Sequence, residues 1–398
     1  MLIIAGVVLG FFWLFTAFPL FLSVLAKVLP VADFKVKTEE ETDFACVITA
    51  YKDIECAINL VSSLLKQDYT RFHVYLVADS CELSDFILKH DKLTVFFPPQ
   101  PLNSKVKSMH YGLERLVRNH SHFIVFDPDN LAHPQFLTEM SALHQQGFDI
   151  VQGKRIAKNL DTKYACLDAF SEYYYNYTQR TVPFRLNSSA TIAGSGMSLP
   201  LDLYMNFIRE EFDMDSDKIV IAEDKMLQVY VIRQGYRIAF AENALVYDEK
   251  VSTGQQVKRQ RTRWITSYFQ YLSTATKLFF QSLLGFSWNK ILFAYTIIIP
   301  PMFIIGLVWI LLTAVTPFIS VWHFITVQLC FLAFVLNIFV ALIFGNAPSK
   351  VTNSLFYAPL FVINQVKALF SMKQTKTSFL TTEKSKNVSV EDVLNVKL

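Results

Sequence analysis

The chain has 398 residues, of which 52% are hydrophobic, 15% aromatic and 18% charged, and its formal net charge is +3. Soluble domains carry about 25% charged residues, so the composition argues against a wholly soluble protein, and the small net charge argues against a nucleic acid partner. The five cysteines form no CxxC pair and are typical of small buried residues in a reducing compartment.

The N-terminal run, residues 1–26, contains no charged residue. It is long enough to cross the ~30 Å core of a bilayer, which takes about 20 helical residues. A cleaved signal peptide is the alternative, but the run has no basic start and no obvious small-residue cleavage site. We therefore predict an uncleaved transmembrane anchor over residues 1–30. The lysines that follow (Lys27, Lys35 and Lys37) favour a cytoplasmic location for the next domain.

Residues 31–266 are predicted to form a water-soluble head. Strand-like apolar runs alternate with segments of helical periodicity; the strands are 44–51, 72–79 and 122–126, and the helices are 53–67 and 105–117. This alternation indicates an α/β fold in which helices cover both faces of a mostly parallel sheet. In such sheets ligands bind beyond the carboxyl ends of the strands, so we expect the site at that edge.

The second half of the head has less regular patterns. We expect a strand over 148–155, a loop of small residues over 191–200, a loop opening into a helix over 221–236, and a last strand over 237–249. A strongly basic helix follows over 253–272.

The C-terminal part is predicted to be membrane-bound. Residues 267–288 mix aromatic and polar side chains, which favours an amphipathic helix at the membrane interface. The charge-free runs 291–315 and 318–344 predict two transmembrane helices within residues 289–346. Basic residues flank these spans, so we expect a multi-pass protein of the cell's inner (plasma) membrane with its head in the cytoplasm.

Residues 347–398 hold a third C-terminal candidate and a polar tail. The segment 355–370 is apolar but contains Asn364, Gln365 and Lys367, so it either spans the membrane or lies at its surface. The last dozen residues are polar, and we expect them to be disordered.

Two carboxylates, Asp127 and Asp129, directly follow the third strand. Carboxylates at i and i+2 can share one divalent cation, and hard oxygen ligands suit Mg²⁺ or Mn²⁺, which also bind diphosphates. The alternative is a simple turn, because Asp-Pro-Asp-Asn is favourable turn chemistry. Since Ala50, Tyr51 and Asp79 end the first two strands, a parallel sheet would bring all of these residues to one edge.

Four further polar residues carry both a functional and a structural interpretation. Asp79 suits a nucleobase or ribose, or else caps a helix. Lys105 suits a base or a phosphate, or else is a solvated lysine. Glu223 and Asp224 lie where a loop enters a helix, where one of them suits a general base. Their alternative role is stabilisation of the helix N-terminus, worth about 0.3–1 kcal/mol.

Gln260, Arg263 and Trp264 share one face of the basic helix, because they are spaced at i, i+3 and i+4. Arginine binds phosphate oxygens in a bidentate manner, and an indole offers an apolar face to a sugar ring. The alternative is a basic juxtamembrane cluster attracted to anionic lipid. We prefer the lipid interpretation for Lys258, Arg259 and Arg261, and a functional role for Arg263 and Trp264.

In this order, and followed by membrane spans, these elements resemble the processive-type family 2 glycosyltransferases. That family includes cellulose, chitin and hyaluronan synthases and the oligosaccharide synthases of Nod-factor production. The resemblance runs from about residue 44 to residue 264. ITAYK, YLVADS, SKVKSMHYGL and FDPDN resemble the family's nucleotide loop, first aspartate, lysine-containing helix start and metal-binding Asp-x-Asp. AEDKMLQVYVIRQGYRIAF and QRTRW resemble its catalytic-base segment and Gln-x-x-Arg-Trp motif, and these two matches are the more specific.

The resemblance implies a GT-A (Rossmann-like) fold and an inverting, single-displacement reaction on a nucleotide-diphosphate sugar, most simply a UDP-sugar. It implies that Asp224 is the general base, that Asp127 and Asp129 bind Mg²⁺ or Mn²⁺, and that Arg263 stabilises the departing diphosphate. The residues implied to bind the nucleotide-sugar are Ala50, Tyr51, Asp79, Lys105, Asp127, Gln260, Arg263 and Trp264. Those implied to shape the acceptor site are Gly194, Ser195, Gly196, Glu223 and Trp264.

The sequence also departs from the family pattern. Asp79 is followed by Ser-Cys instead of a second acid and a glycine, which leaves the nucleotide contacts open. The membrane part is smaller than in synthases that export their own polymer. The protein would then build a tunnel as a homo-oligomer, rely on an export partner, or add a sugar to a lipid-linked acceptor or short glycan in the bilayer.

Two other classes compete with a glycosyltransferase. The first is an inactive membrane scaffold or transporter that retains a nucleotide-binding head. A transporter should show ionisable residues within its spans, but the spans offer only His323, and Asp127, Asp129, Asp224 and Arg263 are all present. The second is a nucleotidyltransferase, which gives no account of the Gln-x-x-Arg-Trp motif beside the membrane.

Overall fold

The computed structural model describes the whole chain except residues 1, 31–33, 83–87, 217–221, 371–387 and 396–398. The chain divides into two compact units. The head unit comprises residues 33–160, 189–251 and 381–398, and the helical unit comprises residues 1–32, 161–188 and 252–380. The segment 161–188, which lies within the predicted head, is therefore part of the helical unit.

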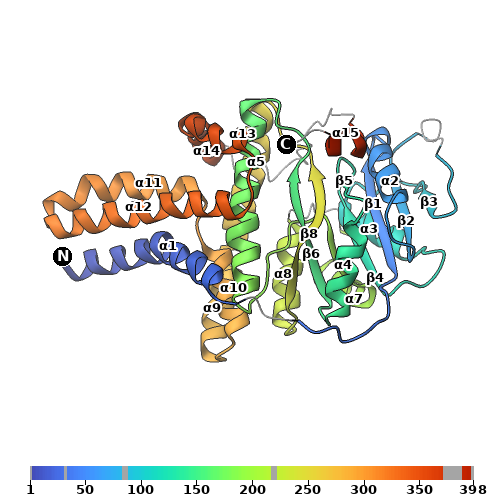
Figure 1. Cartoon of the computed structure of the whole chain (residues 1–398), viewed down its shortest axis with the longest axis horizontal. Coiled ribbons are helices and arrows are strands. Elements are labelled where there is room, and N and C mark those ends of the chain that lie inside the picture. The colour runs from blue at the N-terminus through green and yellow to red at the C-terminus, as the bar shows by residue number, and fades with distance from the viewer. Residues whose placement is uncertain (1, 31–33, 83–87, 217–221, 371–387, 396–398) are drawn as a thin grey trace. The chain divides into compact units, whose positions relative to one another are not determined.

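The described residues of the head form an eight-stranded mixed sheet with the order β3-β2-β1-β4-β7-β6-β8-β5 (Figure 1). The strands are β1 Phe44–Tyr51, β2 Phe72–Asp79, β3 Leu93–Phe96, β4 His122–Phe126, β5 Leu131–Ala132, β6 Ile150–Ala157, β7 Met197–Pro200 and β8 Ile238–Asp248. Four of the seven pairings are parallel, and the three antiparallel ones involve β7 or β5.

The central strands β1 and β2 have the bounds predicted from the sequence. Nearly every side chain of both strands is buried, which explains their continuous apolar runs, since a strand covered on both faces needs no polar alternation. The prediction of a loop over 191–200 is wrong at its end, because Met197–Pro200 form β7 between β4 and β6. The small residues that suggested a loop lie before β7, whereas β7 itself has mostly buried side chains and pairs on both edges.

Seven helices are described in the head. They are the 3₁₀ turn η1 Glu55–Ala57, α2 Ile58–Leu65, α3 Lys105–Leu113, α4 Phe136–Gln145, α7 Leu201–Glu211, α8 Glu223–Arg233 and α15 Val390–Asn395. Helix α3 packs on β1 and β2, and α4 packs on β6 and β8. Ser104 begins α3 as its N-cap, because its side chain accepts a hydrogen bond from the Lys107 backbone.

Helix α15 corrects the prediction of a disordered tail. Val393 packs with Leu131 and Tyr247 in one apolar cluster. Lys66 and Glu391 form an ion pair of 2.5 Å beside it. The tail therefore contains a short helix that docks on the head, and the remainder of the predicted tail lies outside the described residues.

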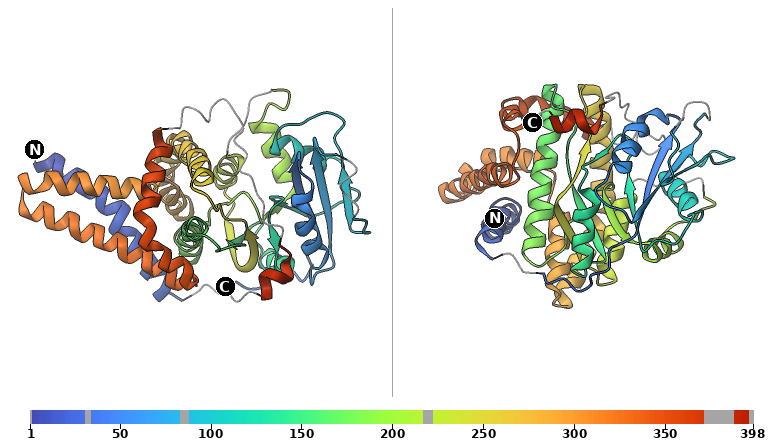
Figure 2. Two further views of the ribbon diagram at one scale, coloured as in Figure 1. Left: turned by 90° about the horizontal axis from the view of Figure 1, so that it is seen from above. Right: turned by 45° about the vertical axis from the view of Figure 1, so that its right-hand side comes forward.

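The helical unit contains the membrane-spanning candidates. Its helices are α1 Leu2–Val28, α5 Lys163–Tyr175, η3 Asn176–Thr181, α6 Val182–Arg185, α9 Gly254–Leu284, α10 Trp288–Ile298, α11 Met302–Val315, η4 Thr316–Phe318, α12 Val321–Phe344, α13 Ser349–Asn353, η5 Ser354–Tyr357 and α14 Ala358–Phe370. Helices α11 and α12 run side by side as a hairpin, and α1 packs against α12 (Figure 1, Figure 2).

Among the described residues, two helices are long and apolar enough to cross a membrane, namely residues 3–28 and 321–344. The predicted single span over 291–315 is instead broken. Helices α10 and α11 meet at an angle of 70°, at the dipeptide Pro300-Pro301, whose rings remove backbone donors and disrupt a helix. Helix α9 continues without interruption through residue 267, where the predicted interfacial segment begins.

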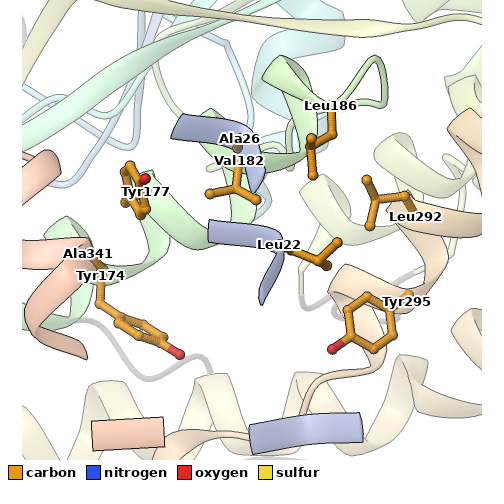
Figure 3. Close-up of a cluster of buried hydrophobic side chains, with 9 residues drawn as sticks. All are labelled: Leu22, Ala26, Tyr174, Tyr177, Val182, Leu186, Leu292, Tyr295 and Ala341. Carbon is orange, nitrogen blue, oxygen red and sulfur yellow. The ribbon is translucent and has the colours of Figure 1, made fainter. Parts of the chain in front are cut away.

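An apolar cluster joins α1 to five other segments of the helical unit (Figure 3). Its buried members are Leu22, Ala26, Tyr174, Tyr177, Val182, Leu186, Leu292, Tyr295 and Ala341. Two of its tyrosine hydroxyls donate to backbone carbonyls of α1: Tyr177 to Ser23 at 3.2 Å and Tyr295 to Leu14 at 2.7 Å. These bonds satisfy phenolic groups that would otherwise be costly to bury in an apolar environment.

Candidate active site

The carboxyl ends of β1, β2 and β4 lie along one edge of the head sheet. The pairing of β1 with both neighbours is parallel, and Tyr51 stands directly opposite Asp79 in register. Asp127 follows β4 immediately. The strand ends that the sequence analysis selected are therefore neighbours in space.

Asp79 is almost completely buried and holds the loop that precedes α3. Its two carboxylate oxygens accept hydrogen bonds from the backbone N–H groups of Leu102 at 2.9 Å and Asn103 at 2.8 Å. Asn103 adopts a positive φ of 52° and accepts a hydrogen bond from the Tyr51 hydroxyl at 2.8 Å. Ser104, and not Asp79, is the N-cap of α3; the helix-cap alternative for Asp79 concerns the segment that follows it, which includes residues 83–87 outside the described residues. Sequence reasoning missed Asn103, although the turn-forming pair Asn-Ser before a helix was a visible signal.

Lys105 is the first residue of α3, and its ammonium lies among three oxygen atoms. Its Nζ donates to Asp127 Oδ1 at 2.6 Å and to the Gly194 carbonyl at 3.0 Å, and it lies 3.8 Å from Glu223 Oε1. Burial alone would lower the pKa of Lys105, but the carboxylates of Asp127 and Glu223 outweigh it and raise that pKa. The alternative of a solvated lysine is wrong.

Asp127 is ionised at neutral pH. Burial would raise the pKa of its carboxyl group, but Lys105 and Arg155 outweigh burial and lower it. The backbone N–H of Asp127 donates to Ser195 Oγ at 3.2 Å, and the Ser195 hydroxyl donates to Asn130 Oδ1. Ser195 is fully buried, and its hydroxyl secures the Asp127–Asn130 turn.

Glu223 and Asp224 are the first two residues of α8, which begins after Ala222 with a left-handed φ of 64°. Burial raises the pKa of Glu223, with Asp224 and Asp127 adding to the effect and Lys105 opposing it. The backbone of Gly194 passes directly over Asp224: a methyl group at Gly194 would lie 3.3 Å from Asp224 Oδ2. Lys105 and the Gly194 backbone therefore connect the Asp127 turn to the start of α8.

Asp248, at the end of β8, organises the same edge and was not selected from the sequence. It accepts hydrogen bonds from Asn130 at 3.1 Å, Arg155 at 2.8 Å and Lys250 at 2.9 Å. Arg155 also donates to the Ala193 carbonyl at 2.8 Å. Asp248 thus ties the Asp127–Asn130 turn to the loop before Gly194. The sequence held a signal for Asp248, because β8, like β2, ends on a carboxylate. In the structure β8 runs parallel to β6.

Asp129 is buried and contacts a second cation. Lys158 donates to the backbone carbonyl of Asp129 at 3.3 Å and lies 3.7 Å from Glu249. Lys158 and Lys250 are themselves buried. A set of buried positive charges therefore offsets the carboxylates that gather here, which an apolar interior would otherwise not tolerate.

Gln260, Arg263 and Trp264 lie on α9 in the helical unit. Gln260 is buried, whereas Arg263 and Trp264 are partly exposed. Their neighbour Arg261 is also buried: it binds Asp168 of α5 at 2.7 Å and Ser171 at 3.1 Å. The lipid-cluster interpretation is therefore wrong for Arg261, while Lys258 and Arg259 are exposed as it requires. The side chain of Arg261 also stacks 4.4 Å from the Trp264 ring centroid.

The metal that the resemblance implies fits the chemistry of this edge. Asp127 already contacts a cation, the Lys105 ammonium, which has three oxygen neighbours, and oxygen atoms are the ligands that Mg²⁺ and Mn²⁺ prefer. Within the described ranges, no group of three or more histidine, cysteine or acidic side chains is arranged to hold a metal ion. The protein would supply Asp127 and Asp129, and a diphosphate and water would have to complete the coordination.

Comparison with known proteins gives one family match. Residues 42–267 match the family described as "Glycosyltransferase like family 2". No curated protein matched the chain. Among solved structures, the mannosyltransferase PcManGT from Pyrobaculum calidifontis in complex with GDP-Man and Mn²⁺ is similar, with 15% identity, a TM-score of 0.49, and coverage of 89% of this chain and 95% of that chain. TarS 1–349 of S. aureus in complex with UDP-GlcNAc has 15% identity, a TM-score of 0.38, and coverage of 53% and 59%.

Proposed function

Since the chain belongs to the glycosyltransferase-like family 2 and its head has the GT-A fold, we propose that it is an inverting glycosyltransferase that moves a sugar from a UDP-sugar to a glycan or lipid-linked acceptor at the membrane. The observation that carries this proposal is the convergence of Asp127, Lys105 and Asp224 around the Gly194 backbone. The structure brings an ionised carboxylate, a cation and a second carboxylate together at the strand edge where ligands bind in such sheets.

Asp224 is the proposed general base. Its carboxylate takes the proton of the acceptor hydroxyl, the hydroxyl oxygen attacks the anomeric carbon, and the bond from that carbon to the diphosphate breaks, so that the nucleoside diphosphate leaves with the bonding electrons. Position supports this role, because Asp224 Oδ2 lies beside the backbone of Gly194, next to the carbonyl that accepts from Lys105. The residues proposed to shape the acceptor side are Glu223, Trp264 and the Gly194-Ser195-Gly196 loop.

The remaining residues bind the donor. Asp79 holds the Leu102–Asn103 loop, and Tyr51 with Ala50 lines the nucleoside side. Asp127 and Asp129 would hold Mg²⁺ or Mn²⁺, which supplies positive charge to the leaving diphosphate. Arg263 and Gln260 are proposed to contact the diphosphate, and Trp264 the sugar ring, from α9.

The membrane-associated helices support the setting of the reaction. We propose a multi-pass protein of the inner (plasma) membrane with a cytoplasmic head and an acceptor at the bilayer. The lysines after α1 and the basic start of α9 support this orientation. The product would be a cell-surface glycan or glycolipid, exported through a homo-oligomer or by a separate partner.

The full-length protein in nanodiscs, incubated with a panel of UDP- and GDP-sugars and Mn²⁺ or Mg²⁺, tests the proposal through nucleotide release. We expect Asp224→Asn to reduce turnover by about 10²–10⁴-fold, while donor affinity measured by calorimetry stays within about twofold of wild type. Asp202→Asn, on α7 in the same unit, is the matched control and should turn over normally. Undiminished turnover in Asp224→Asn contradicts the assignment of the base. Donor binding without turnover in the wild type would favour the inactive scaffold or transporter.

A further inference from the structure

The Lys105 ammonium occupies the position of a cation at Asp127. Its three oxygen neighbours come from three separate segments: Asp127 Oδ1 at 2.6 Å, the Gly194 carbonyl at 3.0 Å and Glu223 Oε1 at 3.8 Å. The side chain is only about one quarter exposed, at 23%. The ammonium therefore neutralises Asp127 within the protein itself.

The backbone holds Lys105 in this place. Ser104 caps α3, and Asp79 fixes the preceding residues through the N–H groups of Leu102 and Asn103. Because the first residue of α3 is thereby anchored, its side chain reaches Asp127 from a fixed starting point. The contact is built into the fold and does not depend on a ligand.

A divalent ion and an ammonium repel each other when they share one carboxylate. Two like charges a few ångströms apart repel each other strongly at the effective dielectric constant near a protein surface. A metal ion that binds Asp127 must therefore displace Lys105 or accept this repulsion. A nucleoside diphosphate changes the balance, because its phosphate oxygens add negative charge that both cations can share.

We propose that Lys105 is an internal cation that competes with the divalent ion for Asp127, so that metal binds tightly only together with a nucleoside diphosphate. This inference rests on the proposed function, since it takes Asp127 as a metal ligand. Glu223 is the second anionic partner within reach of the ammonium. The device would keep metal out of the site until the donor arrives.

The test measures Mn²⁺ binding through the electron paramagnetic resonance signal of free Mn²⁺, with the full-length protein in nanodiscs, first with Mn²⁺ alone and then with Mn²⁺ and UDP. Wild type should bind Mn²⁺ alone weakly and at least about tenfold more tightly with UDP. Lys105→Met and Lys105→Gln, which remove the charge, should each bind Mn²⁺ alone about tenfold more tightly than wild type. Lys105→Arg keeps a cation and should restore weak binding.

Two controls isolate the site. Lys107→Met removes a lysine from the same helix but leaves the Lys105 contacts in place, and this variant should bind Mn²⁺ as wild type does. Asp127→Asn, added to each variant, should abolish the tight component and thereby identify it as the Asp127 site. Thermal unfolding of every variant verifies that the protein is folded.

The outcomes separate the inference from the proposed function. If UDP tightens Mn²⁺ binding in an Asp127-dependent way, but neither neutral variant binds Mn²⁺ alone more tightly than wild type, the inference is overturned and the metal site stands. If no variant shows Asp127-dependent Mn²⁺ binding even with UDP or GDP present, the metal part of the proposed function fails, and the inference fails with it.

Discussion

Gly194 illustrates how much of this site depends on single residues. Its φ of +76° lies in the left-handed region, and an added methyl group would meet Asp224 Oδ2 at 3.3 Å. Its carbonyl also accepts a hydrogen bond from Lys105. One glycine therefore provides a backbone acceptor and the close approach of a loop to the proposed base, which no other residue does without strain.

We expect Gly194→Ala to reduce turnover by roughly 10- to 100-fold, because it displaces the Asp224 carboxylate from its position. Gly235→Ala is the matched control: Gly235 has a φ of +94° with no atom within 4 Å of the added methyl group. Both variants place an alanine in the left-handed region, which should lower the free energy of unfolding by about 1–2 kcal/mol. Thermal unfolding should therefore show a similar loss of stability in the two variants, whereas nucleotide release should be slowed only in Gly194→Ala. Equal activity in the two variants would show that Gly194 serves only its backbone conformation.

At the scale of elements, charged pairs decide which segments are joined. Asp248 joins the end of β8 to the Asp127–Asn130 turn and to β6, and Arg261 joins α9 to α5 through Asp168. The Arg261–Asp168 pair is almost wholly buried, with side-chain exposures of 6% and 2%. Removing one partner of such a pair leaves an uncompensated buried charge, which costs far more than the pair contributes.

Arg261→Leu should therefore destabilise the protein by about 3–5 kcal/mol. Arg259→Leu changes the same residue type on the exposed side of the same helix and should alter stability by about 0.5 kcal/mol or less. The double variant Arg261→Leu/Asp168→Leu should recover part of the loss, because it removes both charges. Thermal unfolding in detergent measures all three. If Arg259→Leu and Arg261→Leu were equally mild, the pair would not stabilise the helical unit.

At the scale of the whole molecule, buried histidines link folding to pH. His144 of α4 donates from Nδ1 to the Phe148 carbonyl at 2.7 Å, so its Nε2 accepts from the Ser198 hydroxyl at 2.9 Å, and the ring is neutral. Its ring centroid lies 4.2 Å from that of His122. Burial lowers the pKa of His144 to about 3, with His122 adding to the effect, and burial lowers the pKa of His122 to about 4.

These depressed pKa values predict acid sensitivity. In the unfolded chain each histidine binds a proton near pH 6.5, whereas in the folded chain it does so only near pH 3 or 4. The contribution of the two neutral histidines to stability is therefore complete above pH 6.5, and it is lost as the pH falls toward the pKa of the folded state. Below pH 6.5, each of the two histidines lowers the free energy of unfolding by up to about 1.4 kcal/mol for each unit by which the pH falls.

His144→Gln should flatten this dependence. Between pH 7 and pH 5 we expect the melting temperature of the wild type to fall by several degrees, at about 2–4 °C per kcal/mol, and that of the variant to fall less. His110→Gln, on a partly exposed side chain of α3, is the control and should follow the wild type. Parallel curves for His144→Gln and wild type would show that the histidine pair does not control the acid response.

Much of the head followed from the sequence. Continuous apolar runs predicted β1 and β2 with the bounds observed, because strands buried on both faces leave a strong signal. The family and the GT-A fold are confirmed by the family match. The broken span was the clearest omission, since Pro300-Pro301 was visible within the apolar run and hydropathy alone took no account of it.

The pairing of charges followed from the sequence far less. From the sequence, Lys105 could be a solvated lysine or a ligand-binding one, and Arg261 was assigned to a lipid-binding cluster. A single basic residue is compatible with each of these roles, so the residue type alone does not distinguish them. Asp248 stands at a strand end, but its contacts with Asn130 and Arg155 are made only in the folded protein. Lys105 is 22 positions from Asp127, and Asn130 and Arg155 are 118 and 93 positions from Asp248.

The sequence by itself determined where apolar runs end in carboxylates, which segments suit a bilayer, and which family the motifs resemble, because these depend on local pattern. Only the tertiary structure decided that Lys105 lies between Asp127 and Gly194, that Asp79 holds a loop, and that Arg261 is buried with Asp168. The physical reason is range: hydrophobic periodicity is expressed within one element, whereas an ion pair requires two residues to come within about 4 Å, which only the folding of distant segments brings about.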